Sequence, residues 1–177
     1  NYAAKFGVNM DLLDLLIGAF EARLLKLLAK TLDIPNFDQL EENIWFGGIN
    51  PVSLIIKHEF KRVLDLRDEA SSDFGSRLTQ NCVQYSNVKI LDTHGTTITE
   101  LDTIVNWLKS SNEKTLVHCN LGRGRAAMVS IAYLLTNGAM LNDAIKSTKK
   151  ARSVVYINKF QRESLKQFSK YVWENND

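Results

Sequence analysis

A cysteine and an arginine in the middle of the chain are separated by a short, glycine-containing segment that could bind an anion. Cys119 follows His118, and the five residues between Cys119 and Arg125 are Asn120, Leu121, Gly122, Arg123 and Gly124. The two glycines accept backbone angles that a side chain resists, so successive N–H groups can turn inward around an anion. The Arg125 guanidinium can hold two phosphate oxygens, and a thiol in such positive surroundings becomes a nucleophile at neutral pH.

Two apolar segments flank this loop and would hold it in place. Residues 114–117 are predicted to form a short buried strand, and residues 126–135 an apolar helix that ends near Asn137 and Gly138. The helix would direct the positive end of its dipole toward the loop. This strand–loop–helix arrangement predicts that residues 120–125 bind phosphate while Cys119 attacks it.

The segment from His118 to Arg125 resembles the His-Cys-x5-Arg signature of the cysteine-dependent protein tyrosine phosphatases. The short chain with its single motif is most similar to the dual-specificity branch, and the resemblance extends by layout over roughly residues 44–168. It implies an α/β fold with a central, mostly parallel sheet of four to five strands flanked by helices. It also implies a supporting role for His118, which in the family tunes the cysteine by hydrogen bonding.

The resemblance implies a general acid on a mobile loop that precedes the cysteine loop. In this chain the layout selects Asp92, which follows the predicted strand 82–91 and precedes a helix with Thr97 at its N-terminus. The leaving oxygen needs a proton, and a carboxylic acid beside an apolar cleft can supply it. Asp92 as a simple turn cap and Asp102 as the acid are the alternatives. His94 either touches substrate or is a plain loop residue.

Two further positions bear on the second half of such a reaction. Gln161 resembles the glutamine that orients the attacking water in some family members, but Asn158 and Gln161 also have the spacing of a capping box. Ala126 departs from the family pattern, which usually has Ser or Thr after the arginine. That hydroxyl is thought to stabilise the departing thiolate, so we expect slow hydrolysis of the phosphoenzyme and unimpaired capture of phosphate.

The expected reaction is hydrolysis of phosphate monoesters through a cysteinyl-phosphate intermediate, without a metal or another cofactor. We expect phosphotyrosine in proteins as substrate, with phosphoserine and phosphothreonine also admitted. Arg123 adds a second cation to the loop, where lipid-directed relatives often carry a lysine, so a phosphoinositide or another phospholipid is the alternative. A phosphate-binding module without turnover is a second alternative, which Ala126 alone supports.

Composition limits the other possibilities. The 177 residues suffice for one domain with a sizeable core, and the net charge of +2 gives no argument for nucleic-acid binding. Two cysteines, Cys82 and Cys119, cannot form a disulfide framework, which fits a reducing, cytoplasmic setting. We expect Cys82 to be a small core residue rather than a partner for a regulatory disulfide.

Residues 1–35 are predicted to be a helical extension and residues 36–177 the phosphatase domain. The predicted helix, residues 11–32, carries a broad apolar stripe: Leu12, Leu13, Leu16, Ile17, Phe20, Leu24, Leu27 and Leu28. Charges interrupt it too often for a membrane span. We expect the stripe to pack on the domain; pairing with a second protomer and contact with a membrane surface are the alternatives, and the oligomeric state stays open.

Charged residues near the loop allow more than one interpretation. Arg67 and Asp68 are expected to form a solvated ion pair at a strand end. The cluster that ends the predicted helix from residue 141 is either a basic helix terminus in water or a positive rim around the cleft: Lys146, Lys149, Lys150 and Arg152.

Overall fold

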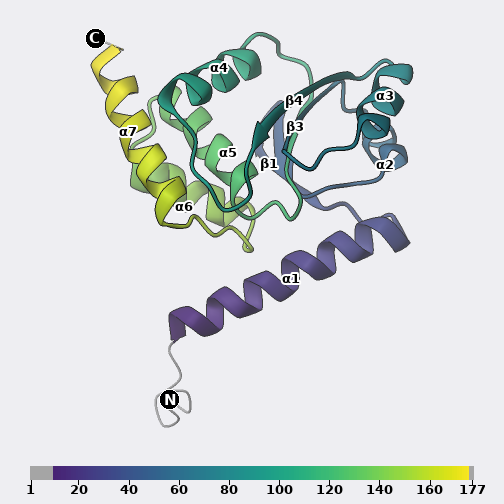
Figure 1. Cartoon of the computed structure of the whole chain (residues 1–177), viewed down its shortest axis with the longest axis horizontal. Coiled ribbons are helices and arrows are strands. Elements are labelled where there is room, and N and C mark those ends of the chain that lie inside the picture. Colours follow the sequence, from purple (N-terminus) through teal and green to yellow (C-terminus); the bar gives the residue numbers. More distant parts are fainter. Residues whose placement is uncertain (1–9, 176–177) are drawn as a thin grey trace.

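The computed structural model describes residues 10–175, in which helices and strands alternate along the chain (Figure 1). The helices are α1 (Met10–Leu32), α2 (Val52–Lys57), α3 (Ser72–Gln80), α4 (Ile98–Lys109), α5 (Arg125–Thr136), α6 (Leu141–Ala151) and α7 (Lys159–Asn175). The strands are β1 (Phe37–Glu41), β2 (Ile44–Gly47), β3 (Arg62–Arg67), β4 (Gln84–Ile90) and β5 (Thr115–His118).

The five strands form one sheet in the order β1-β2-β5-β3-β4. β1 pairs antiparallel with β2, whereas the β2–β5, β5–β3 and β3–β4 pairs are parallel. The expected mostly parallel α/β sheet is therefore confirmed. Because parallel strands end at the same edge, the residues that follow β3, β4 and β5 come together there.

Helices cover both faces of the sheet, as Figure 1 shows: α4, α5, α6 and α7 lie on one side and α2 and α3 on the other. Alternate residues of each central strand enter different cores, as expected from the two-residue period of a strand. In β3, Leu64 and Leu66 pack with α5, whereas Val63 packs with α2 and α3. The sheet is thus buried on both faces and gives the loops at its edge a rigid base.

The apolar stripe of α1 does not pack on the domain as expected. The inner side of the helix includes small residues, of which Ala22 and Ala29 are fully buried. Six members of the predicted stripe face away from the sheet, with exposed fractions of 41–66%: Leu12, Leu16, Ile17, Phe20, Leu24 and Leu27. Leu28 is half-buried, and the Leu13 side chain lies outside the described part of the structure. Small side chains permit a close approach of the helix, which explains why the alanine side is the docked one. No helix in the described part of the chain could cross a membrane.

Two elements were not predicted from the sequence, and one cysteine was placed wrongly. β1 is an edge strand with a single neighbour, and α3 contains Gly75 in its interior, which weakens a helical pattern. Gly75 is needed there because a Cβ atom would lie 2.5 Å from the ring of Tyr85. Cys82 is exposed in the turn between α3 and β4, with φ at 58°, and is not a core residue.

Candidate active site

The loop between β5 and α5 wraps around the thiol of Cys119. Cys119 is 3% exposed, and its own N–H donates to the carbonyl oxygen of Gly47 at 3.2 Å. The N–H of Gly122 donates to the Cys119 Sγ atom at 3.3 Å, which favours negative charge on sulfur. Gly122 has a φ of 72°, and a Cβ atom there would lie 2.4 Å from the Gly47 carbonyl carbon. The expected turned-in backbone is present at this position.

The second glycine of the loop serves close packing instead of an unusual backbone angle. Gly124 has a φ of −111° and precedes the first residue of α5. A Cβ atom at Gly124 would lie 2.7 Å from the side-chain nitrogen of Gln161. A side chain at position 124 would therefore displace the Gln161 amide at the start of α7.

The buried guanidinium of Arg125 is surrounded by carboxylates. Nη1 donates to Asp68 at 3.1 Å, to Glu69 at 3.0 Å and to the carbonyl oxygen of Ile90 at 3.0 Å, and Nη2 donates to Glu69 at 3.1 Å. Nε lies 3.3 Å from Oδ1 of Asp92 and has no hydrogen-bond acceptor among the described residues. A buried donor without an acceptor costs about 1–3 kcal/mol, which a bound oxyanion would recover.

These contacts shift the pKa values of the charged groups. Burial alone would lower the pKa of Arg125, but the hydrogen bonds to Glu69 and the charges of Cys119 and Asp92 raise it. The hydrogen bond from Arg125 lowers the pKa of Glu69 to about 2, against a smaller opposing effect of burial. Both groups are thus charged at neutral pH, and an entering phosphate must compete with Glu69 for the same guanidinium.

Asp92 stands beside this guanidinium on the loop after β4. It lines a cavity of about 430 Å³ together with Cys119 and Arg125, so the three residues expected to carry the reaction meet in one place. The Asp92 side chain is 72% exposed, which leaves it free to move with its loop. Asp102, the alternative acid, does not line this cavity and accepts a hydrogen bond from Asn106 at 3.1 Å within α4. His94 stacks on Phe160.

His118 supports the loop from beneath, in a fully buried environment. Its Nδ1 atom lies 3.3 Å from the carbonyl oxygen of Cys119, and its Nε2 atom lies 3.8 Å from Asp65. Burial lowers the pKa of His118, although the charge of Asp65 acts in the opposite direction. Asp65 in turn accepts hydrogen bonds from Arg67 and from the hydroxyl of Tyr85. The histidine therefore contacts Cys119 at its backbone carbonyl group.

Gln161 forms the capping box that its spacing from Asn158 predicts, and it also lies at the cavity. It forms the capping box of α7 with Asn158: each residue's N–H donates to the other's side-chain oxygen, at 3.0 and 3.2 Å. The same side chain is buried, lies against Gly124 and lines the Cys119 cavity. The cap fixes the Gln161 amide at the cavity wall, where a water molecule could reach it.

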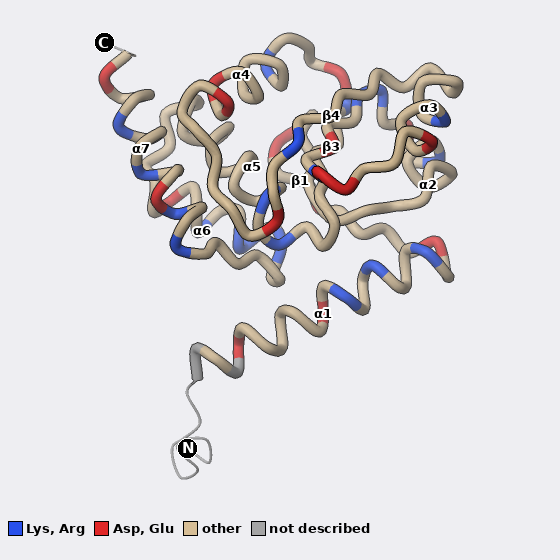
Figure 2. The backbone as a smooth tube through the Cα atoms, viewed as in Figure 1, with Lys and Arg blue, Asp and Glu red and all other residues tan. Residues whose placement is uncertain are grey.

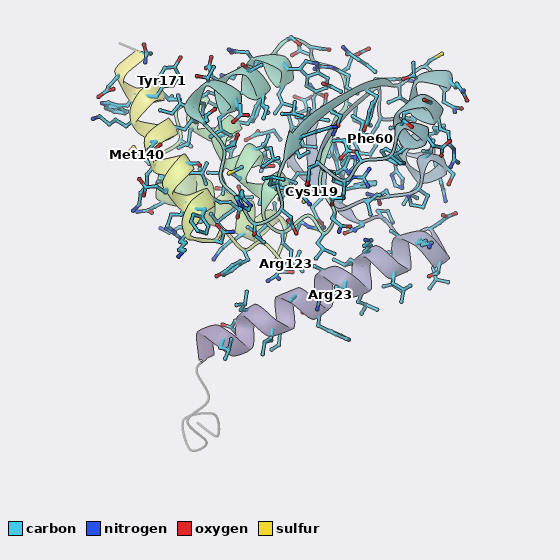
Figure 3. The ribbon with its side chains drawn as sticks, in the orientation of Figure 1. Arg23, Phe60, Cys119, Arg123, Met140 and Tyr171 are labelled. Carbon is cyan, nitrogen blue, oxygen red and sulfur yellow. The ribbon has the colours of Figure 1, made fainter. Side chains whose placement is uncertain are left out.

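The remaining loop side chains connect the cavity to α1. Arg123 donates through Nε to the carbonyl oxygen of Val154 at 3.0 Å and through Nη2 to that of Leu15 at 3.2 Å. Figure 3 shows Arg123 at the edge of the domain nearest to α1, with Cys119 farther inside. Lys26 of α1 donates to the Asn120 side chain at 2.5 Å. Leu15, Asn120, Leu121 and Arg123 all line the cavity, so α1 forms part of its wall.

A buried arginine behind the loop was not predicted from the sequence. Arg152 was expected to face water or to join a positive rim with nearby lysines, but it is 3% exposed. Its Nε atom donates to the carbonyl oxygen of Gly122 at 3.1 Å and Nη2 to that of Leu121 at 3.2 Å. The N–H groups of the same two planar peptide units, those of Arg123 and Gly122, therefore point the opposite way. Asn36 and Asp38 accept further hydrogen bonds from it. Only the basic run from Lys146 to Arg152 hinted at this arginine.

The predicted ion pair of Arg67 with Asp68 is also absent. Arg67 pairs instead with Asp65 at 2.6 Å in the interior, and Asp68 turns to Arg125 at the edge of the sheet. Successive residues of a strand point to opposite faces, so two neighbours at its end rarely meet. Asp68 and Glu69 are consequently part of the site. Within residues 10–175, no cluster of three or more His, Cys, Asp or Glu side chains could hold a metal ion.

A buried thiol, an arginine and a carboxylic acid around one cavity at the edge of a parallel sheet are the groups that a cysteine-dependent phosphatase requires. Residues 44–171 match the family model described as "Dual specificity phosphatase, catalytic domain". The chain belongs to this family of dual-specificity phosphatases.

Comparisons with individual proteins agree with the family. The tyrosine phosphatase 123R of Invertebrate iridescent virus 6 is 28% identical over 139 residues, which cover 78% of this chain and 95% of that protein. Human dual specificity protein phosphatase 1 is 30% identical over 94 residues, 50% of this chain and 26% of that longer protein. The PTPMT1 structure is 22% identical, superimposes with a TM-score of 0.71, and covers 79% of this chain and 98% of its own.

Proposed function

We propose that this phosphatase hydrolyses phosphate monoesters through a cysteinyl-phosphate intermediate, with Cys119 as nucleophile, Asp92 as general acid and Arg125 as the principal oxyanion ligand. The observation that carries the proposal is their convergence on one cavity, with the Gly122 N–H and the Arg125 guanidinium around the Cys119 thiol. Phosphotyrosine in proteins is the proposed substrate, with phosphoserine and phosphothreonine also accepted. Relatives with tyrosine or dual-specificity phosphatase names support this choice.

In the first step the Cys119 thiolate attacks phosphorus. An S–P bond forms, the P–O bond to the leaving group breaks, and the leaving oxygen takes a proton from Asp92. Negative charge grows on the equatorial oxygens, where Arg125 and the loop N–H groups stabilise it. The Nε–H of Arg125 lacks an acceptor among the described residues and is suited to donate a hydrogen bond to one of these oxygens.

In the second step a water molecule attacks the phosphoenzyme. Asp92, now ionised, accepts a proton from the water, the S–P bond breaks, and inorganic phosphate leaves with the thiolate restored. We propose that the Gln161 amide, which lines the cavity, orients this water. His118 holds the loop from below and is proposed to tune Cys119 through the backbone.

The test is phosphate release from a matched panel: a phosphotyrosine peptide, a phosphothreonine peptide and a phosphoinositide. Cys119→Ser should abolish release from every substrate, because a hydroxyl is far less acidic than a thiol. Asp92→Asn should lower kcat by about 10²–10⁴. Asp102→Asn is the matched control, since Asp102 does not line the cavity, and should keep the wild-type rate.

Two outcomes would contradict the proposal. A loss with Asp102→Asn and none with Asp92→Asn would reverse the assignment of the acid. Phosphopeptide binding without release of phosphate by the wild-type chain would leave only a binding module, the alternative that Ala126 supports.

A phosphate monoester carried by a lipid is the second candidate substrate. The observation in its favour is the exposed apolar side of α1, a helix that also forms part of the cavity wall. A crystal structure of PTPMT1, a relative in fold, contains PI(5)P. Faster release from the phosphoinositide than from both peptides would select this candidate.

A further inference from the structure

The outer face of α1, defined here as Leu16, Ile17, Phe20, Leu24 and Leu27, is a continuous apolar surface. At 3.6 residues per turn, these five positions fall on one side of the helix, opposite Ala22 and Ala29. Each of the five side chains is at least 41% exposed, so no described segment of the chain covers them. A folded helix that turns its large apolar residues outward requires a partner to remove them from water.

Polar contacts with the active-site loop, together with the burial of Ala22 and Ala29, set the orientation of α1. Arg123 binds the Leu15 carbonyl oxygen, Lys26 binds Asn120, and the space beside Gly18 holds the Arg123 guanidinium, 3.3 Å from where a Cβ atom would be. These polar contacts fix the small-residue side toward the domain. The outer face is thereby directed away from the domain, as its exposure shows. Figure 1 shows α1 along one side of the domain.

Basic residues lie along one edge of this apolar face. Arg23 and Lys30 are exposed and seven residues apart, so they share that edge, and Figure 2 shows basic residues confined to the C-terminal half of α1. Lys26, Lys30 and Arg77 also line a groove of about 380 Å³ beside α2 and α3, and no carboxylate lines it. The opposite edge of the apolar face carries two exposed acidic residues, Asp14 and Glu21, so the basic residues mark one edge of the face. Apolar side chains with basic ones along one edge match the boundary between acyl chains and anionic head groups.

We propose that the outer face of α1 binds an anionic phospholipid surface. The apolar side chains would enter the head-group region, and Arg23 and Lys30 would meet anionic lipids at its surface. Antiparallel pairing with a second copy fits less well, because a two-fold axis would place this basic edge against its own copy.

The position of α1 gives this surface a consequence for the active site. Leu15 and Arg123 line the Cys119 cavity, so the cavity lies on the inner side of the helix whose outer side contacts lipid. An α-helix with its side chains is about 10–12 Å in diameter, so the lipid surface would lie within about that distance of the cavity wall. Tyr156, which also lines the cavity, is 43% exposed at the same border.

Vesicle flotation of the full chain tests the proposal. We expect it to float with vesicles of phosphatidylcholine and phosphatidylserine, and more weakly with phosphatidylcholine alone. Phe20→Ala with Leu24→Ala, which preserves helix propensity, should lower the partition coefficient at least tenfold. Arg23→Gln and Lys30→Gln should each lower it about fivefold, and only when phosphatidylserine is present.

Control variants show whether flotation depends on the outer face of α1. Met140→Ala with Trp173→Ala removes exposed apolar side chains elsewhere, before α6 and near the C-terminus of α7, and should leave flotation unchanged. Cys119→Ser should float like the wild type, so failure of the phosphatase proposal would not affect this result. The Phe20→Ala and Leu24→Ala variant should hydrolyse a soluble aryl phosphate at the wild-type rate.

Three results would overturn the proposal. The first is absence of flotation with either vesicle. The second is flotation that survives removal of Phe20 and Leu24. The third is a stable dimer in sedimentation that this double substitution converts to a monomer without any lipid binding, which would assign the face to a second copy.

Discussion

The Nε atom of Arg152 donates to the carbonyl oxygen of Gly122 at 3.1 Å, across 30 positions of the sequence. A loop that turns its N–H groups toward an anion must turn its carbonyl groups away, and buried carbonyl groups need donors. Arg152 supplies these donors at Gly122 and Leu121 and is itself held by Asn36 and Asp38. The arginine thus supports the loop from the side opposite to Cys119.

Arg152→Lys should therefore impair catalysis although the substitution keeps the positive charge. An ammonium group cannot reproduce the planar, multidentate contacts, so carbonyl groups of the loop lose donors at about 1–3 kcal/mol each. We expect kcat/KM for an aryl phosphate to fall about tenfold or more and the melting temperature to decrease. Lys150→Ala, an exposed position on the same helix, is the matched control and should leave both values unchanged. If Arg152→Lys had wild-type kinetics, the loop would keep its conformation without the contacts of Arg152.

Glu69→Gln should strengthen the binding of oxyanions. In the structure Glu69 occupies two nitrogen atoms of Arg125, and an entering phosphate must compete with it. Removing its negative charge should lower the inhibition constant of vanadate or inorganic phosphate severalfold. The measurement is competitive inhibition at pH 7, where Glu69 is ionised because Arg125 lowers its pKa to about 2. Glu163→Gln, on the exposed side of α7, is the control. If vanadate or phosphate inhibited Glu69→Gln more weakly than the wild type, the role of Glu69 would instead be to orient the Arg125 guanidinium.

Ala126→Ser should raise turnover if hydrolysis of the phosphoenzyme limits the rate. Position 126 is fully buried in the first turn of α5, next to Arg125. A hydroxyl there would stabilise the departing thiolate in the second step and leave the first step unaltered. We expect a pre-steady-state burst with the wild-type chain and a smaller burst with higher kcat in the variant. An unchanged burst and kcat would show that the missing hydroxyl does not control turnover.

His118 should make the folded state less stable as the pH falls below about 6.5. Burial lowers its pKa in the folded state from the ordinary value of 6.5, so the unfolded chain binds the proton more readily. One such group decreases the free energy of unfolding by at most about 1.4 kcal/mol per pH unit, between 6.5 and the lowered value.

Urea unfolding at several pH values between about 7.5 and 5.5 measures this dependence. His118→Gln should lower stability overall but flatten the slope, whereas His94→Gln, on the exposed loop after β4, should retain it. Asp65 titrates below this range, because burial raises its pKa less than Arg67 and His118 together lower it. An equal slope in His118→Gln would assign the pH dependence to other groups.

Much of the site was predictable from the sequence because its signals are local. The strand, loop and helix around Cys119 are consecutive in the chain, and Gly122 marks the turn directly. The position of Asp92 was predictable from the order of elements, since loops at the carboxyl ends of parallel strands converge. The helical period of α1 was also clear, and its bounds differ by one residue from the prediction.

Other features depend on contacts between distant segments, and only the tertiary structure decided them. Whether Arg152 faces water or the loop carbonyl groups depends on where α6 ends relative to β1, which no local pattern records. The partners of Asp68 and Glu69 depend likewise on the position of Arg125. For α1, the hydrophobic period located an apolar face but could not give its direction. Polar contacts of Arg123 and Lys26 fixed that direction, because they hold the side with small residues against the domain.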